Sequence, residues 1–187
     1  EGLTRLQDKV EPFSFGEVEK IVTDELGVRL SKAFAKFEAE PLAAASLGQV
    51  HHAWLRDGRE VAVKIQRPNI RARISEDLDA FSEMAAFLDQ NTEMGRIYEF
   101  GLIVEELRKS LLNELDYREE ARNLQILHNN LLEFNRLFVP LPVYDYTTSR
   151  VLTMEYVKGK KVTSISPLRC SRRRRWRMAT GTTSPRP

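Results

Sequence analysis

The chain has 187 residues, 42% of them hydrophobic and 30% charged, which suffices for one folded domain with an apolar core. Its single cysteine excludes an intramolecular disulfide and a thiolate metal cluster, and no apolar run reaches the roughly eighteen residues of a membrane span. The net charge of +2 is misleading, because residues 169–187 hold seven arginines and no acid, which leaves 22 basic and 27 acidic residues elsewhere. The body is therefore acidic, and no nucleic-acid partner is expected for it.

The first predicted element is a helix between Ser14 and Gly27. Glu17 follows Ser14 at the spacing of a capping box, and Gly27 is typical of a helix end. Between them, apolar residues recur every three or four positions. One face of this helix should therefore pack on the rest of the fold.

Strands are predicted from about Phe34 onward. The runs 49–55 and 60–66 flank an Asp57-Gly58 pair, which is a strong signal for a β-hairpin. In the second run, alternation puts the larger aliphatic residues on one face and Lys64 on the other.

Helices should follow, one from Pro68 to about Leu88 and a longer one over 97–132, because apolar residues recur there at helical spacing. Strands are predicted again at 139–146 and 151–157, on either side of a Thr-Thr-Ser turn. The predicted order is helices, three strands, two helices and two strands.

The segment that begins at Ala43, Ala-Ala-Ala-Ser-Leu-Gly-Gln-Val, fits the spacing of the kinase glycine-rich loop, G-x-G-x-x-G-x-V. Ala43 and Ala45 stand in the first two glycine places, and Gly48 and Val50 take the third glycine and the valine. Residues without bulk let backbone N–H groups approach phosphates, and Val50 would pack on the base. We therefore expect this loop, Ser46 included, to contact a nucleotide.

Fourteen residues after Val50, Lys64 ends a Val-Ala-Val-Lys run with the form of the kinase strand motif. The lysine of that motif contacts the α and β phosphates, and Ala62 is small enough to lie over an adenine. A buried ammonium needs a carboxylate partner, since it would otherwise lose its proton. Glu120, on a following helix, is the candidate.

The last predicted strand leads into Met154-Glu155-Tyr156-Val157, where a kinase N-lobe crosses to its second lobe. There the carbonyl of Glu155 and the N–H of Val157 are expected to contact the adenine edge. The expected cofactor is ATP or ADP with Mg²⁺. No H-x-D, following asparagine or D-F-G occurs after this segment, so no metal ligand is assigned and the chain alone is expected to be inactive.

Two segments resemble the UbiB family of atypical kinase-like proteins, also called AarF or ABC-one. They are Pro-Leu-Ala-Ala-Ala-Ser-Leu-Gly-Gln-Val-His from residue 41 and Glu-Leu-Asp-Tyr-Arg-Glu-Glu-Ala-Arg-Asn from residue 114. The resemblance spans about residues 3–163. It implies that Glu120 pairs with Lys64, and that Glu114 and Asp116 form an E-x-D motif that would meet a K-x-G-Q segment, which does not occur here. It also implies ATP or ADP binding and a role in ubiquinone or related isoprenoid lipid metabolism, often at a membrane.

The predicted fold is α+β. Residues 39–166 should form a protein-kinase-like N-lobe, a small antiparallel sheet with long helices, behind an N-terminal helical extension at residues 1–38. The C-lobe is expected to be missing, and residues 167–187 are predicted to be a basic, low-complexity, disordered tail. The sequence starts at Glu1 rather than a methionine and shows no signal-peptide pattern, so we expect a fragment of a longer protein. That protein is expected to be cytoplasmic or peripheral to a membrane, or organellar in a eukaryote.

Two alternative hypotheses remain open on the sequence alone. A non-catalytic interaction or regulatory module predicts that binding is indifferent to Lys64 and Val157. An arginine-rich tail that binds nucleic acid or an anionic membrane predicts that binding falls steeply with salt.

Overall fold

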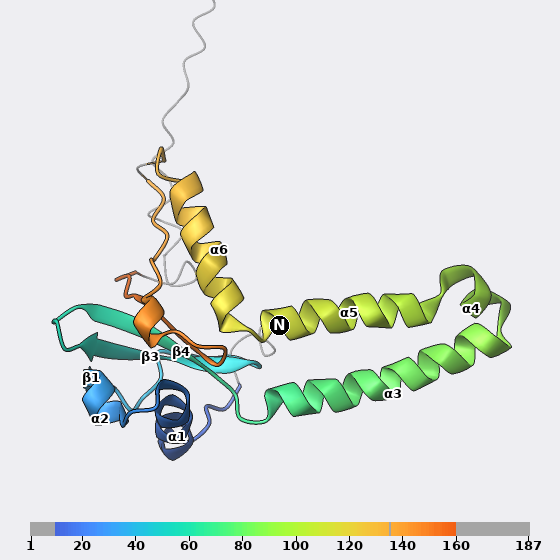
Figure 1. Ribbon diagram of the computed structural model, residues 1–187, viewed down its shortest axis with the longest axis horizontal. Coiled ribbons are helices and arrows are strands. Elements are labelled where there is room, and N and C mark those ends of the chain that lie inside the picture. The colour runs from blue at the N-terminus through green and yellow to red at the C-terminus, as the bar shows by residue number, and fades with distance from the viewer. Residues whose placement is uncertain (1–9, 135, 160–187) are drawn as a thin grey trace, which may run out of the picture. The chain divides into compact units, whose positions relative to one another are not determined.

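The computed structural model describes residues 10–134 and 136–159. The chain divides into two units, Glu1–Tyr156 and Val157–Pro187, and the fold described below is that of the first. It is a mixed fold in which a small antiparallel sheet carries helices on both faces, consistent with a kinase-like N-lobe (Figure 1). The α+β class predicted from the sequence is confirmed.

The sheet consists of β1 (Phe34–Phe37), β2 (Ala43–Ala44), β3 (Gly48–Leu55), β4 (Glu60–Gln66) and β5 (Val151–Glu155). The order is β1-β3-β4-β5, all neighbours are antiparallel, and β2 pairs with the first part of β3. The predicted hairpin is confirmed. It turns at Gly58, which has a φ of 89°, and the Asp57 carboxylate accepts the Arg59 N–H at 3.0 Å.

The first helix, α1 (Phe15–Leu26), begins at the predicted capping box. The Ser14 hydroxyl accepts the Glu17 N–H at 3.4 Å, and the Glu17 carboxylate accepts the Ser14 N–H at 3.0 Å. Gly27 ends the helix in the left-handed region, with a φ of 69°. Both ends of this helix were therefore predictable from short-range chemistry.

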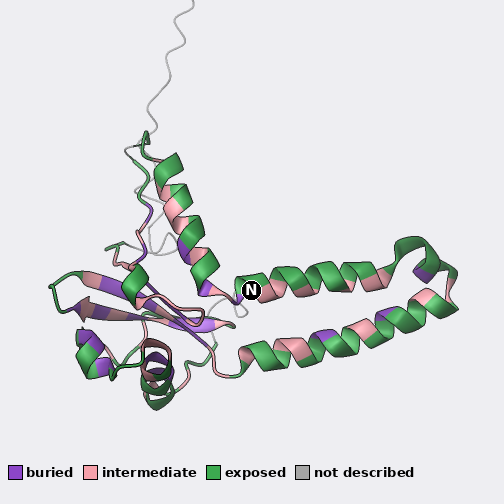
Figure 2. Ribbon diagram, in the orientation of Figure 1, coloured by how far each residue is buried: buried purple, intermediate pink, exposed green. Residues whose placement is uncertain are grey.

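One face of the sheet is covered by α1 and by the short helix α2 (Leu30–Ala33). Val18 and Val22 of α1 are fully buried and share an apolar core with Val61, Val63 and Ile65 of β4. Figure 2 shows the buried residues concentrated in the sheet and in the helices packed on it. The core contains residues of the predicted N-terminal extension at 1–38 and of the predicted N-lobe at 39–166, and β1 of the extension pairs with β3 of the lobe. The α1 face is thus an integral layer of the fold.

The single helix predicted over 97–132 is wrong. Helix α3 (Ile70–Asn91) is followed by α4 (Glu93–Tyr98), α5 (Phe100–Glu114) and α6 (Tyr117–Asn130). Glu99, between α4 and α5, has a φ of 48° in the left-handed region, which interrupts the helix. The Asp89 carboxylate then accepts the N–H groups of Phe100 and Gly101, each at 2.9 Å, and so satisfies the start of α5.

The second break separates α5 from α6. Asp116 has extended backbone (φ −102°, ψ 100°), and its carboxylate accepts the Arg118 N–H at 3.0 Å as the N-cap of α6. This break lets α6 leave the direction of α5 and cover the second face of the sheet. There Tyr117 and Ala121 pack with Leu152 of β5.

The strand predicted over 139–146 is also wrong. This segment makes one isolated bridge, Pro142 to Met154, and a 3₁₀ helix, η2 (Tyr144–Tyr146). Pro140 and Pro142 have no N–H to donate, which limits regular pairing with β5.

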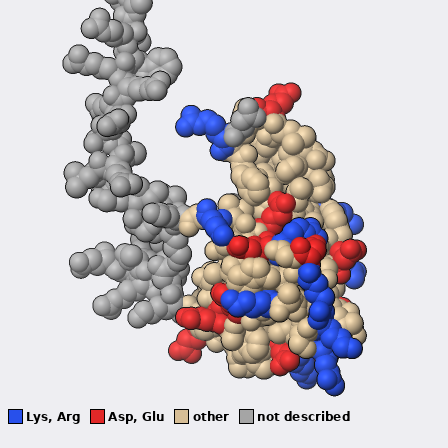
Figure 3. Space-filling model, turned by 90° about the vertical axis from the view of Figure 1, so that its left-hand side faces the viewer, with Lys and Arg blue, Asp and Glu red and all other residues tan. Residues whose placement is uncertain are grey.

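The second unit is described only over residues 157–159, so the predicted tail at 167–187 lies outside the described residues. In the described part of the chain, no helix is both long and apolar enough to cross a membrane. On the face drawn in Figure 3, the described part of the chain carries both basic and acidic side chains.

Candidate functional site

The face of the sheet covered by α6 carries an ion pair. Lys64 of β4 and Glu120 of α6 are 56 residues apart, yet the Lys64 Nζ lies 2.7 Å from Oε2 and 2.9 Å from Oε1 of Glu120. The two side chains are 29% and 38% exposed, so water reaches both. The pairing predicted from the sequence is present, and the ammonium keeps an open side.

Tyr117, one helical turn before Glu120, lies under this pair. The Lys64 Nζ is 4.6 Å from the centre of the Tyr117 ring, within the range of a cation–π interaction. The Tyr117 side chain is 1% exposed, and burial, with a smaller effect of the Glu120 charge, raises the pKa of its hydroxyl. Lys64 is therefore held between a carboxylate and an aromatic ring.

The strand positions next to Lys64 form a flat, mostly apolar strip. Residues opposite each other on neighbouring antiparallel strands share a face, and Val50 pairs with Lys64 while Ala62 pairs with Met154. Ala62 is buried and Met154 partly buried. The structure thus brings Val50, Ala62 and Lys64 to one face, as the sequence predicted.

The alanine-rich loop forms a tight turn between β2 and β3. Ala43 pairs with Val50, the Ala45 N–H donates to the Gly48 carbonyl at 2.7 Å, and Ala43, Ala45 and Ser46 are all exposed. A Cβ at position 48 would lie 2.4 Å from the Ile65 carbonyl oxygen. Glycine is therefore required at 48 by close packing against β4, whatever its role toward a phosphate.

The E-x-D pair occupies the junction of α5 and α6. Glu114 is the last residue of α5 and Asp116 the N-cap of α6. Because Asp116 has extended backbone and lies just before the first residue of α6, Asp116 and Glu120 do not share a helical face as they would in one continuous helix.

A cavity of about 780 Å³ lies between the Lys64–Glu120 pair and the junction of α5 and α6. Glu114, Asp116, Glu120 and Lys64 line it together with Leu47 of the loop. No group of three or more histidine, cysteine, aspartate or glutamate residues in the described part of the chain is arranged to hold a metal ion.

Glu155 ends β5 at the predicted crossing. Its N–H donates to the Leu141 carbonyl at 3.0 Å, and its carboxylate accepts the Leu141 N–H at 3.1 Å. Val157 is exposed and belongs to the second unit. The contacts of Glu155 and Val157 with an adenine edge stay predictions.

Two aromatic features escaped the sequence interpretation. The first is Tyr117, whose place three residues before Glu120 in the E-L-D-Y segment was a usable signal. The second is a stack in which the His52 ring lies 4.1 Å from the Tyr156 ring and 4.0 Å from the Trp54 ring. Because His52 pairs with Ala62, this stack adjoins the apolar strip.

Comparison with known proteins identifies the family. Residues 5–182, nearly the whole chain, match the ABC1 atypical kinase-like domain. The chain belongs to the ABC1 atypical kinase-like family. The family resemblance predicted from the loop and the E-x-D segment is confirmed.

ABC1 relatives cover a wide range of organisms. The chain is 42% identical over 166 residues to a probable protein kinase UbiB of Cellvibrio japonicus, covering 89% of this chain and 30% of the relative. It is 37% identical over 166 residues to the chloroplastic protein ACTIVITY OF BC1 COMPLEX KINASE 7 of Arabidopsis thaliana, covering 89% and 24%. The chain thus spans about a quarter to a third of the length of these curated relatives.

A solved structure has a similar fold. Rv3197 of Mycobacterium tuberculosis, determined in complex with erythromycin, superposes with a TM-score of 0.70 at 33% sequence identity. The match covers 79% of this chain and 37% of that one.

Proposed function

We propose that the cavity beside Lys64 binds ATP or ADP as a Mg²⁺ complex, with the phosphates at Lys64. The observation that carries this is the Lys64–Glu120 pair, which lines a cavity of about 780 Å³ next to a strip of small and apolar residues. A lysine ammonium has three donors, and Glu120 uses two at most. The remaining donor on the open side can bind a phosphate oxygen.

Glu120 and the neighbouring carboxylates set the electrostatics of this site. Glu120 fixes the position of the ammonium before the nucleotide arrives, which reduces the ordering cost of binding. Glu114 and Asp116 line the same cavity and would repel bare phosphates. We therefore assign the nucleotide as its Mg²⁺ complex, in which the metal neutralises phosphate charge, with Glu114 and Asp116 as the described carboxylates able to face it.

The adenine is assigned to the strip beside Lys64. Ala62 leaves room for a flat ring, and Val50 and Met154 offer apolar contacts on the same face. The loop of Ala43, Ala45 and Ser46 would cover the phosphates, while the Glu155 carbonyl would contact the adenine edge. These assignments extend the kinase arrangement to the residues at matching positions.

For the whole protein we propose phosphoryl transfer or ATP hydrolysis, linked to ubiquinone or related isoprenoid lipid metabolism. The names of the UbiB and BC1 complex kinase relatives support this. We assign the protein to the cytoplasm or a membrane surface, or to an organelle as for the chloroplastic relative. Lipid or membrane partners would be contacted by the complete protein.

Calorimetric titration of the folded chain with Mg-ADP and Mg-ATP tests the nucleotide assignment. Saturable binding of one nucleotide per chain is expected. A chain that unfolds cooperatively on heating yet binds neither nucleotide would overturn it.

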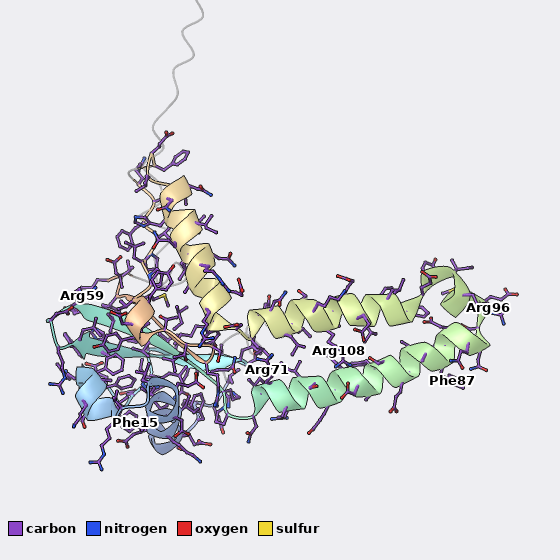
Figure 4. The ribbon with its side chains drawn as sticks, in the orientation of Figure 1. Phe15, Arg59, Arg71, Phe87, Arg96 and Arg108 are labelled. Atoms are coloured by element: carbon purple, nitrogen blue, oxygen red, sulfur yellow. The ribbon has the colours of Figure 1, made fainter. Side chains whose placement is uncertain are left out.

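The exposed apolar residues of the α3–α5 hairpin favour a second candidate, an interaction module. Met84, Phe87 and Ile97 expose 60%, 64% and 72% of their surface, and the Phe87 side chain points away from α5 (Figure 4). Arg108 instead points between the helices and donates to Asp79 at 2.7 Å. Exposed apolar surface of this kind is typical of protein contacts. This candidate predicts that Lys64→Ala does not change the affinity of the chain for a protein partner.

A further inference from the structure

The Tyr117 hydroxyl is buried without a partner. The side chain is 1% exposed, and no described residue accepts or donates a hydrogen bond to its oxygen. A hydroxyl removed from water without a hydrogen bond is unfavourable, and native structures contain few such groups. A phenylalanine would fill the same space without this cost, so packing alone does not account for the hydroxyl.

The hydroxyl lies between the two elements assigned to phosphate binding. A Cβ at position 48 would come within 2.9 Å of its oxygen, which places it against the base of the alanine-rich loop. The ring of the same residue lies under the Lys64 ammonium. Tyr117, Leu47 and Lys64 all line the cavity.

The chemistry of the hydroxyl restricts what it can bind. Burial and the charge of Glu120 raise the pKa of Tyr117, so the hydroxyl keeps its proton at physiological pH and serves as a donor. A buried donor requires an acceptor, and phosphate oxygens are strong acceptors. The neighbouring ammonium already attracts the same anion.

We propose that Tyr117 is a phosphate ligand of the nucleotide site, whose hydroxyl donates a hydrogen bond to a phosphate oxygen when the turn at Ala45–Leu47 moves to admit it. This inference rests on the proposed nucleotide function and adds a residue to it. Tyr117 then links the loop, the Lys64–Glu120 pair and the start of α6 to one ligand group.

The substitution Tyr117→Phe tests this, because it removes the hydroxyl and keeps the ring under Lys64. Adenosine and Mg-ADP are titrated into wild type, Tyr117→Phe and a matched control, Tyr98→Phe, whose tyrosine is exposed on α4. Loss of a hydrogen bond to a charged group should weaken Mg-ADP binding about 10- to 100-fold in Tyr117→Phe. Adenosine affinity should stay unchanged, and the ligand-free melting temperature should be equal or higher.

The outcomes separate this inference from the proposed function. Wild type that binds Mg-ADP, with equal affinity in Tyr117→Phe, would overturn the phosphate contact and leave the function standing. An equal loss for adenosine and Mg-ADP would indicate a purely structural role and also overturn it. A folded wild type that binds neither ligand would overturn both.

Discussion

Replacing Lys64 with alanine separates the part that its ammonium plays in ligand binding from its part in folding. A charge-assisted hydrogen bond contributes about 1.5–3 kcal/mol, so Lys64→Ala should weaken Mg-ADP binding about 10- to 150-fold. Folding should suffer little. Lys64 and Glu120 are 29% and 38% exposed, and ion pairs in contact with water contribute up to about 1 kcal/mol.

Calorimetry and urea unfolding measure the two effects in parallel. Lys109→Ala is the matched control, since Lys109 is an exposed lysine of α5 that pairs with Glu106 at 2.8 Å. Its affinity should equal that of wild type. Equal Mg-ADP affinities in Lys64→Ala and wild type, with both chains folded, would refute the assignment of Lys64 to the phosphates.

Three further predictions concern the fold around the site. Ser14→Ala removes the capping box and should lower the free energy of unfolding by about 1 kcal/mol in urea titration; an unchanged midpoint would contradict this. Gly48→Ala should cost about 1–3 kcal/mol or more, because its Cβ meets the Ile65 carbonyl oxygen at 2.4 Å, whereas Gly16→Ala, with nothing within 4 Å, should not destabilise. Because the folded-state pKa of Tyr117 is raised, the folded chain keeps the phenol proton at a pH where the unfolded chain loses it. This effect on the free energy of unfolding is fully favourable below a pH of about 10 and is lost as pH rises toward the folded-state pKa. The fall in the free energy of unfolding above a pH of about 10 should therefore be smaller in Tyr117→Phe.

Local sequence chemistry predicted the elements that depend on neighbours in the chain. The capping box at Ser14, the left-handed Gly27 and the Asp57-Gly58 turn each act over a few residues, and all three are present. The two faces of β4 follow from alternation alone. The Lys64–Glu120 contact, 56 residues apart, was accessible only through the resemblance to kinase-like proteins.

The breaks in the long helix were not predictable from periodicity. Apolar spacing continues through Glu99 and Leu115, yet Asp89, ten residues before the first break, caps the new helix across the hairpin. At the second break, Asp116 begins a new helix as its N-cap, and the spacing of hydrophobic residues did not indicate this position. A pattern that counts only apolar residues takes no account of polar side chains that cap a helix.

Backbone hydrogen exchange with and without Mg-ADP tests the central claim most directly. The nucleotide assignment predicts slower exchange in the loop at 43–50, in β4 around Lys64 and around Glu155, with α3 and α4 unchanged. Unchanged exchange at all three sites under saturating Mg-ADP, in a folded chain, would contradict the claim that this face of the sheet binds a nucleotide.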